Sequence, residues 1–210
     1  MSDTQNVYID KDSLELLQFF IFKSTADPFT ACCRRAYLDF NRTLHLKKEG
    51  KNQAQSNDLT TKGTEILRKS ILQMMDAGID SQDKYDSWHF KVCTALRKLY
   101  REAGVSFTYG QSQKWLNMTM KYLYVLRAYS FEDIFAFLHP PIDNYILDAA
   151  MSEFEISRFP MAWSKLDDYQ TYLDYQKSLR TQIFGCPPLR WEFRAWLREA
   201  KKKAHDWAGE

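Results

Sequence analysis

Two lysines in one expected helix, and an aspartate beyond it, are the residues of this chain whose types and spacing could do chemistry. Lys114 and Lys121 lie seven residues apart in an apolar stretch that begins near Gly110. An α-helix repeats every 3.6 residues, so this spacing places both ammonium groups on nearly one face, about 20° apart. A helix that is apolar nearly all round is buried, and a buried ammonium needs a carboxylate partner or a functional reason.

Asp143 is the candidate carboxylate for such a pair. It follows the His-Pro-Pro sequence at residues 139–141, which ends the preceding helix and favours the start of a new one. Asp143 therefore falls at the first turn of the new helix, where free backbone N–H groups and the helix dipole would keep it ionised and fixed. Alone, such an aspartate is more often only a helix cap. Together with Lys114, or with Lys121 as the alternative lysine, it predicts a catalytic pair.

Two short motifs, Gln113-Lys114-Trp115 and Pro141-Ile142-Asp143, lie on either side of an expected short second helix and the proline break. This order of parts, over about residues 105–148, resembles the helix-hairpin-helix superfamily of DNA glycosylases. It is most similar to the divergent archaeal 8-oxoguanine glycosylase branch. In that family a lysine near the start of the second hairpin helix attacks the sugar C1′, and an aspartate follows a proline-containing turn. The resemblance implies that Lys114 and Asp143 are the catalytic residues.

The hairpin itself departs from the usual family motif, Leu-Pro-Gly-x-Gly-x-Lys. Residues 107–114 read FTYGQSQK, with one glycine and no proline, and the archaeal branch also lacks the standard hairpin. Gly110, Gln111 and Ser112 nevertheless open the expected helix with small or polar residues. Because a helix amino end binds phosphate, we expect these three residues to contact the DNA backbone.

The resemblance implies a DNA glycosylase that cleaves the N-glycosidic bond of a damaged or modified base in DNA. Glu192 and Trp196, one turn apart on the last helix, resemble the pair that lines the base pocket in the archaeal branch. The nearest resemblance implies 8-oxoguanine, and a modified pyrimidine, including a modified base of invading phage DNA, stays open. Asp143 would stabilise the positive charge on the sugar. Lys114 would either form a Schiff base with AP lyase activity or stay charged while water attacks.

Composition predicts an all-α fold. The 210 residues include 15% aromatic residues but only seven glycines and six prolines, and every long apolar segment has helical periodicity. We expect about eight to ten helices in one glycosylase-like unit over residues 1–210, as two lobes that flank a cleft. The hairpin and catalytic segment would occupy about residues 82–150.

Cap and turn residues predict where the helices begin and end. Asp12 or Ser13 would cap the first helix, and a second helix would run over about residues 30–46. The polar, non-periodic stretch at residues 47–58 predicts a mobile surface loop. Gly78 would end the third helix.

Several functional classes are excluded or left without support. The sequence contains no run of 18 apolar residues, so we expect no membrane span. The polar, acidic N-terminus does not have the pattern of a signal peptide. The four cysteines have no CxxC spacing, so we expect reduced core thiols, no metal and no cofactor. A net charge of +2 is compatible with DNA but is no argument for it. The expected protein is a cytoplasmic monomer that binds DNA.

A different class of function stays open beside the glycosylase. The chain could be a non-catalytic all-α interaction protein, in which Lys114 and Asp143 form a structural ion pair. The two hypotheses differ in geometry. A glycosylase needs the pair at the floor of an open, aromatic-lined cleft, whereas a structural pair is closed over by packing or lies at the rim.

Overall fold

The computed structural model describes residues 10–23 and 27–208, and all regular secondary structure in these ranges is helical. The prediction of an all-α fold is therefore confirmed. The described residues form eight α-helices and three short 3-10 helices: α1 (Lys11–Phe22), α2 (Pro28–Phe40), η1 (Asn41–Thr43), α3 (Gln53–Ala77), α4 (Gln82–Glu102), α5 (Tyr109–Val125), η2 (Phe135–Phe137), α6 (Asn144–Phe154), η3 (Trp163–Lys165), α7 (Tyr169–Gln182) and α8 (Pro188–Ala208).

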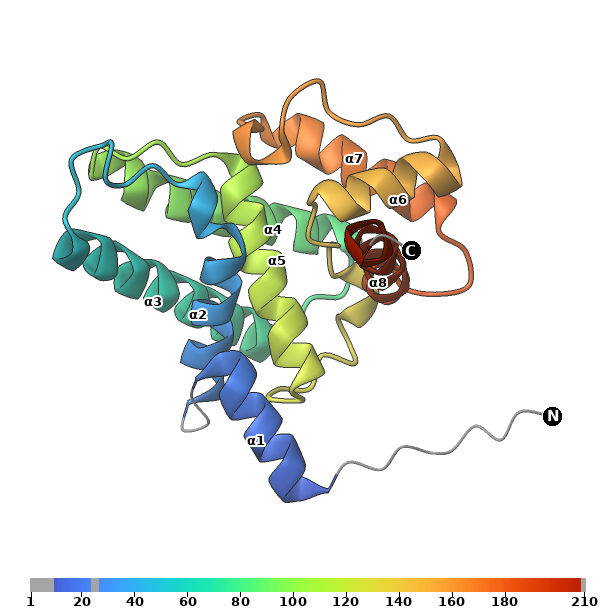
Figure 1. The fold of residues 1–210 in the computed structure, drawn as a ribbon, viewed down its shortest axis with the longest axis horizontal. Helices are drawn as coiled ribbons and strands as arrows, with labels where there is room; N and C mark the ends of the chain where they lie inside the picture. The colour runs from blue at the N-terminus through green and yellow to red at the C-terminus, as the bar shows by residue number, and fades with distance from the viewer. Residues whose placement is uncertain (1–9, 24–26, 209–210) are drawn as a thin grey trace.

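Helix α5 is the central element of the fold. Figure 1 shows it running through the middle of the molecule, with α1, α2 and α3 on one side and α6, α7 and α8 on the other. Its residues are buried without interruption from Tyr109 to Met120, as the nearly all-round apolar sequence predicts. The expected division of the fold into two lobes that flank a cleft goes further than this arrangement, and it stays a prediction.

One face of α5 is fixed against α2 and α3 by Trp115. Its indole is fully buried and donates a hydrogen bond of 3.0 Å to the carbonyl oxygen of Cys33. Gly63 of α3 lies so close that a Cβ atom there would come within 2.3 Å of the Trp115 ring. Consecutive helical residues differ by about 100° in direction. Locking Trp115 against α2 and α3 therefore sets the direction in which Lys114 leaves the helix.

Some helix ends differ from those expected. Asp10 caps α1, because its side chain accepts the N–H of Ser13 at 2.9 Å, so the prediction of Asp12 or Ser13 as the cap is wrong. The second helix ends at Phe40 rather than near residue 46, because the chain turns through η1 and Leu44 continues in extended backbone.

The predicted surface loop at residues 47–58 is wrong in its second half. Helix α3 already begins at Gln53, because Asn52 and Gln55 form a reciprocal capping box with hydrogen bonds of 2.9 and 3.0 Å. The expected short second helix before the proline break is only the 3-10 turn Phe135–Phe137. The expected end of α3 at Gly78 is confirmed.

The described helices include none with the length and apolar content that a bilayer span requires. Three of the four cysteines, Cys32, Cys33 and Cys93, are buried free thiols, as expected for core positions. Cys186 is only half-buried, so the expectation of a core thiol does not hold there.

Candidate catalytic site

Lys114 and Asp143, which the sequence predicted as a pair, meet in the structure. The Lys114 Nζ donates to the Asp143 Oδ2 over 2.7 Å. The Lys114 side chain is 5% exposed and that of Asp143 is 14% exposed. The pair therefore lies at the junction of α5 and the start of α6, largely shielded from water.

The Asp143 carboxylate is held by three donors. It caps α6, with Oδ1 accepting the backbone N–H of Ile146 at 3.1 Å. Its Oδ2 accepts both Lys114 and the indole N–H of Trp196, the latter at 3.2 Å. Burial works to raise the pKa of Asp143, but the positive charge of Lys114 and these hydrogen bonds outweigh burial, so its pKa is lowered. Asp143 is a fixed, ionised carboxylate.

A second ion pair lies beside the first. Lys121, two turns after Lys114, lies 2.8 Å from the carboxylate of Glu192 on α8. Glu192 is fully buried, and burial raises its pKa, although the charges of Lys121 and Lys114 oppose the rise. Asp143 adds to the rise by repulsion. Trp196 connects the two pairs, because it donates to Asp143 and its ring centre lies 5.7 Å from the Lys121 Nζ. Together the pairs place four ionisable groups in one largely buried region.

Aromatic side chains surround these charges. The Lys121 Nζ lies 5.1 Å from the ring centre of Phe193 and 5.7 Å from that of Trp196. Trp196 also packs edge-on against Tyr145, with ring centres 5.1 Å apart. The sequence-predicted pair of Glu192 and Trp196 thus lies against Lys121, and Trp196 also contacts Asp143, the partner of Lys114. Contact of these two residues with a base stays a prediction.

A glutamine that the sequence analysis did not assign holds the backbone beside the pair. The Gln113 Nε2 donates to the carbonyl of Ile142 at 3.0 Å, and the Ile142 N–H donates to the Gln113 Oε1 at 3.2 Å. Gln113 precedes Lys114 and Ile142 precedes Asp143. These two hydrogen bonds therefore fix the two chain segments on which the pair depends.

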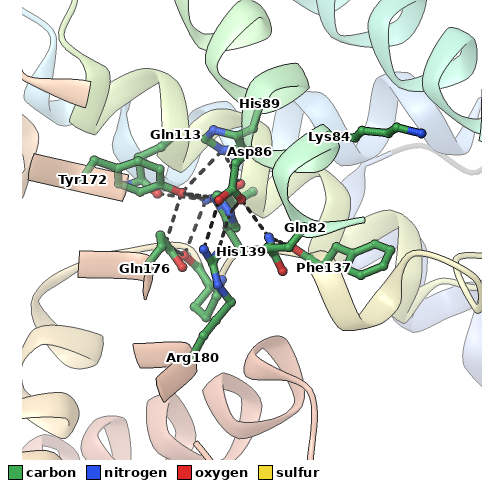
Figure 2. Close-up of polar contacts among 12 residues, drawn as sticks. Gln82, Lys84, Asp86, His89, Gln113, Phe137, His139, Tyr172, Gln176 and Arg180 are labelled. Carbon is green, nitrogen blue, oxygen red and sulfur yellow. Dashed lines mark hydrogen bonds and ion pairs between the residues drawn. The ribbon is translucent and has the colours of Figure 1, made fainter. Parts of the chain in front are cut away.

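A larger buried network, shown in Figure 2, includes His139 from the same turn. His139 lies between Asp86, 2.8 Å from its Nε2, and the hydroxyl of Tyr172, 2.9 Å from its Nδ1. Arg180 donates to the second oxygen of Asp86 at 3.0 Å. Burial alone would raise the pKa of Asp86, but His139 and Arg180 lower it to about 2. The ionised Asp86 therefore requires the proton of neutral His139 to be on Nε2.

This proton arrangement sets the direction of the next hydrogen bonds. The His139 Nδ1 must accept the Tyr172 proton, so the Tyr172 oxygen is free to accept an N–H of Asn117 at 2.9 Å. Asn117 donates its other N–H to Gln113 at 3.1 Å and accepts from the His89 Nε2 at 2.9 Å. A continuous chain of hydrogen bonds thus leads from Asp86 to the glutamine beside Lys114.

From the sequence, His139 is predicted only to be part of a helix break. A signal for the network was present in the sequence, because Asp86 and His89 occupy the apolar face of α4 one turn apart. Their partners come from α5, the turn before α6 and α7, which are far away in sequence. Spacing within a helix cannot identify partners of that kind.

Gly110, Gln111 and Ser112 are all buried in the structure. A Cβ atom on Gly110 would come within 1.8 Å of the carbonyl oxygen of Trp163. Gln111 donates to Thr43, and Ser112 donates back within its own helix. The three residues therefore have internal partners, and their contact with DNA stays a prediction.

Compared with models of known protein families, with curated proteins and with solved structures, the chain matches none.

Proposed function

We propose that the protein is a DNA glycosylase that removes a damaged or modified base. The observation that carries the proposal is the Lys114–Asp143 pair, with Nζ and Oδ2 2.7 Å apart. Its carboxylate caps a helix and also accepts from Trp196. A lysine and a fixed carboxylate, next to aromatic rings and a second buried charge pair, are the groups that the resemblance to helix-hairpin-helix glycosylases requires at this place.

Asp143 supplies electrostatic stabilisation in this proposal. Positive charge develops on the sugar ring as the base leaves, and a preorganised carboxylate stabilises that charge more strongly than water does. Three donors already hold Asp143 in place. Little reorganisation is therefore needed when the charge forms.

Lys114 acts on C1′ of the same sugar in this proposal. As a neutral amine it attacks C1′ and forms a Schiff base, which permits strand cleavage by β-elimination. As an ammonium held by Asp143, it leaves the attack to water, and the product is an intact abasic site. Borohydride reduction separates the two routes, because only the Schiff base becomes a permanent cross-link.

The base itself would lie against α8. Glycosylases extrude the target nucleotide from the duplex into a pocket. Trp196 offers a ring on which the base can stack. The Glu192 carboxyl group can accept a hydrogen bond from the base edge, or donate one when it is protonated, and the Lys121 ammonium can donate one. Burial raises the pKa of Glu192, and a protonated carboxyl group can donate a hydrogen bond to a base nitrogen or oxygen. Because the Lys114 side chain is only 5% exposed, entry of the base requires side chains of α8 to move aside.

The same burial is the observation that favours the alternative, a non-catalytic interaction protein with a structural ion pair. A buried ion pair contributes little more net stability than well-packed apolar side chains of similar volume would. A need for stability alone is therefore a weak reason for such a pair. Packing closes over the Lys114 side chain, as the structural alternative requires, and the presence of a second buried pair beside it, Lys121–Glu192, is the observation that supports the catalytic proposal.

The test is a screen of duplexes that each carry one damaged or modified base, including 8-oxoguanine and modified pyrimidines. Released base is measured by mass spectrometry, and strand nicking by gel electrophoresis. The proposal expects release from at least one class of base, with or without nicking. No release from any duplex, by a protein that is folded at the assay temperature, would favour the structural pair.

A further inference from the structure

A cavity of about 670 Å³ lies where the carboxyl end of α5 meets the start of α8. Its wall combines aromatic rings with two arginines: Tyr124, Tyr129, Phe193, Arg127 and Arg190. This volume lies within the range of pockets that bind small molecules or single nucleotides. None of the residues assigned above to catalysis lines it.

Arg190 lies among three aromatic rings. Its Cζ is 5.5 Å from the ring centre of Tyr124, 5.4 Å from that of Phe135 and 5.4 Å from that of Phe193. Its guanidinium donates to the hydroxyl of Tyr124. No carboxylate pairs with Arg190 in the described part of the chain. Most of its N–H donors are therefore free for a ligand.

The local electrostatics favour an anion. Arg190 is the third residue of the 21-residue helix α8, so a cation is placed at the positive end of the helix dipole, where it is least favourable. Arg127 adds a second positive charge to the wall, and Glu132 is the carboxylate that lines the cavity with them. A bound phosphate would offset the excess positive charge.

The cavity adjoins the candidate catalytic site through one side chain. The ring centre of Phe193 lies 5.1 Å from the Lys121 Nζ and 5.4 Å from the Arg190 Cζ. Lys121 pairs with Glu192, the neighbour of Phe193. Phe193 thus lines the cavity and also contacts Lys121, whose partner Glu192 is proposed to receive the extruded base.

We propose that this cavity binds a second unpaired nucleotide of the DNA strand, next to the extruded one. Its phosphate lies on Arg190 and Arg127, and its base lies against the aromatic wall. The inference rests on the proposed function for the identity of the strand as DNA. Rings paired with guanidinium groups are the usual receptor for single-stranded nucleic acid, because every base has a face for stacking and every nucleotide has a phosphate.

The test uses fluorescence anisotropy with a dye-labelled oligothymidylate of about ten nucleotides, long enough to span a single-strand site. Arg190→Gln is compared with Arg194→Gln, which removes the same charge from the same helix one turn later. Arg194 lies outside this cavity and contacts Cys186 instead. We expect Arg190→Gln to weaken binding about tenfold and to lower the salt slope by about 0.7, the value for one phosphate on a single strand. Arg194→Gln should change the affinity by less than about twofold.

Competition separates a nucleotide from a phosphate ion. Thymidine monophosphate should displace the oligonucleotide at a lower concentration than inorganic phosphate does, because only the nucleotide uses the aromatic wall. Equal losses in Arg190→Gln and Arg194→Gln, or equal competition by the two anions, would overturn the inference. Arg190→Lys keeps the positive charge while it changes the side chain. It should bind the oligonucleotide more tightly than Arg190→Gln, which would show that the loss in Arg190→Gln comes from the charge and not from misfolding.

The outcome is separable from that of the proposed function. If no base is released from any duplex but Arg190→Gln still weakens oligonucleotide binding selectively, the cavity stands as a nucleotide site without glycosylase activity. If base release is found and the two arginine variants bind alike, the proposed function stands and the second nucleotide site is rejected.

Discussion

The Nζ of Lys114 and the Oδ2 of Asp143 lie 2.7 Å apart, and the same oxygen accepts the indole N–H of Trp196. Three helices thus meet at one carboxylate oxygen, because Lys114 comes from α5, Asp143 caps α6 and Trp196 comes from α8. The consequences of this meeting point can be measured as stability, as pH dependence and as chemistry.

The first prediction concerns the stability of the pair. Lys114→Met leaves the Asp143 carboxylate buried without its charged partner, which typically costs about 3–5 kcal/mol of unfolding free energy. Adding Asp143→Asn removes the uncompensated charge while an amide still caps α6, so the double variant should recover at least half of the loss. Urea denaturation of both variants measures this. A loss below about 1 kcal/mol in Lys114→Met would contradict the burial of the pair.

The second prediction concerns Gln113, which joins the segments that carry the pair. Gln113→Met removes both hydrogen bonds to Ile142 and leaves the buried backbone N–H and carbonyl of Ile142 unpaired. This should lower the free energy of unfolding by about 1–3 kcal/mol. The freed turn would misplace Asp143, and displacement by about 1 Å can lower a rate about a hundredfold. We therefore expect base release to fall much more than stability alone explains.

The matched control for Gln113 is Gln176→Met. Gln176 is also fully buried, and it donates to the carbonyl of Pro140, in the same turn but further from Asp143. Its removal should cost similar stability and leave base release within about tenfold of the wild type. Equal rates for the two variants would show that Gln113 has no special positioning role.

The third prediction concerns pH and the two buried histidines. Burial lowers the pKa of His89 and of His139 below the usual 6.5, with Asp86 opposing the shift at both. Both are therefore neutral when folded, whereas the unfolded chain takes up their protons below pH 6.5. Stability should be fully present above that pH and should fall as the pH decreases, by up to about 1.4 kcal/mol per pH unit for each proton.

Urea denaturation between pH 7.5 and 5.5 measures the effect, in a range above the usual titration of carboxyl groups. The raised pKa of Glu192 works in the opposite direction, so the difference between the wild-type protein and a histidine variant isolates the histidine contribution. His89→Gln, which cannot take up a proton, should reduce the slope to about half, whatever its effect on stability at pH 7.5. A flat profile for the wild-type protein would mean that the histidines are charged in the folded state or reach solvent.

Part of this architecture follows from sequence, and the reasons are physical. Periodicity identified α5 because it is apolar nearly all round, and Gly78 marked the end of α3 because a backbone φ of 73° there suits glycine. The start of α3 was missed because its first turns are polar and depend on the Asn52–Gln55 capping box rather than on apolar residues.

The candidate site divides in the same way. Asp143 follows from local rules, because a carboxylate after two prolines caps a helix. Its pairing with Lys114, or with Lys121 as the alternative, was predicted because a buried ammonium needs a carboxylate, and the resemblance then favoured Lys114. The place of Glu192 and Trp196 came from the resemblance alone, and the structure brings these two residues together with Lys114 and Asp143. The network around His139 was missed because its partners lie 33 residues away in Tyr172 and 53 residues away in Asp86, and only tertiary packing joins them.

The fourth prediction separates the two lysines. Lys114→Gln should abolish covalent trapping by borohydride and any strand nicking, while DNA binding persists, because only Lys114 lies on the Asp143 carboxylate. Lys121→Gln leaves buried Glu192 unpaired, so it should lose stability and base affinity but keep trapping. Trapping that depends on Lys121 and not on Lys114 would place the nucleophile two turns away from our assignment.

Base release by Asp143→Asn, compared with Asp168→Asn, tests the central claim most directly. Both aspartates cap a helix, α6 and α7, and asparagine caps about as well, so the caps survive in both variants. Asp143→Asn also leaves the buried Lys114 without its charged partner, so it should be the less stable variant, and both rates are measured at a temperature at which both variants are folded. Asp168 has no lysine partner among the described ion pairs and lies outside the candidate site. The account predicts that Asp143→Asn loses base release by about a hundredfold or more, while Asp168→Asn retains the wild-type rate. Full activity of Asp143→Asn on every base that the wild-type protein releases would contradict the account.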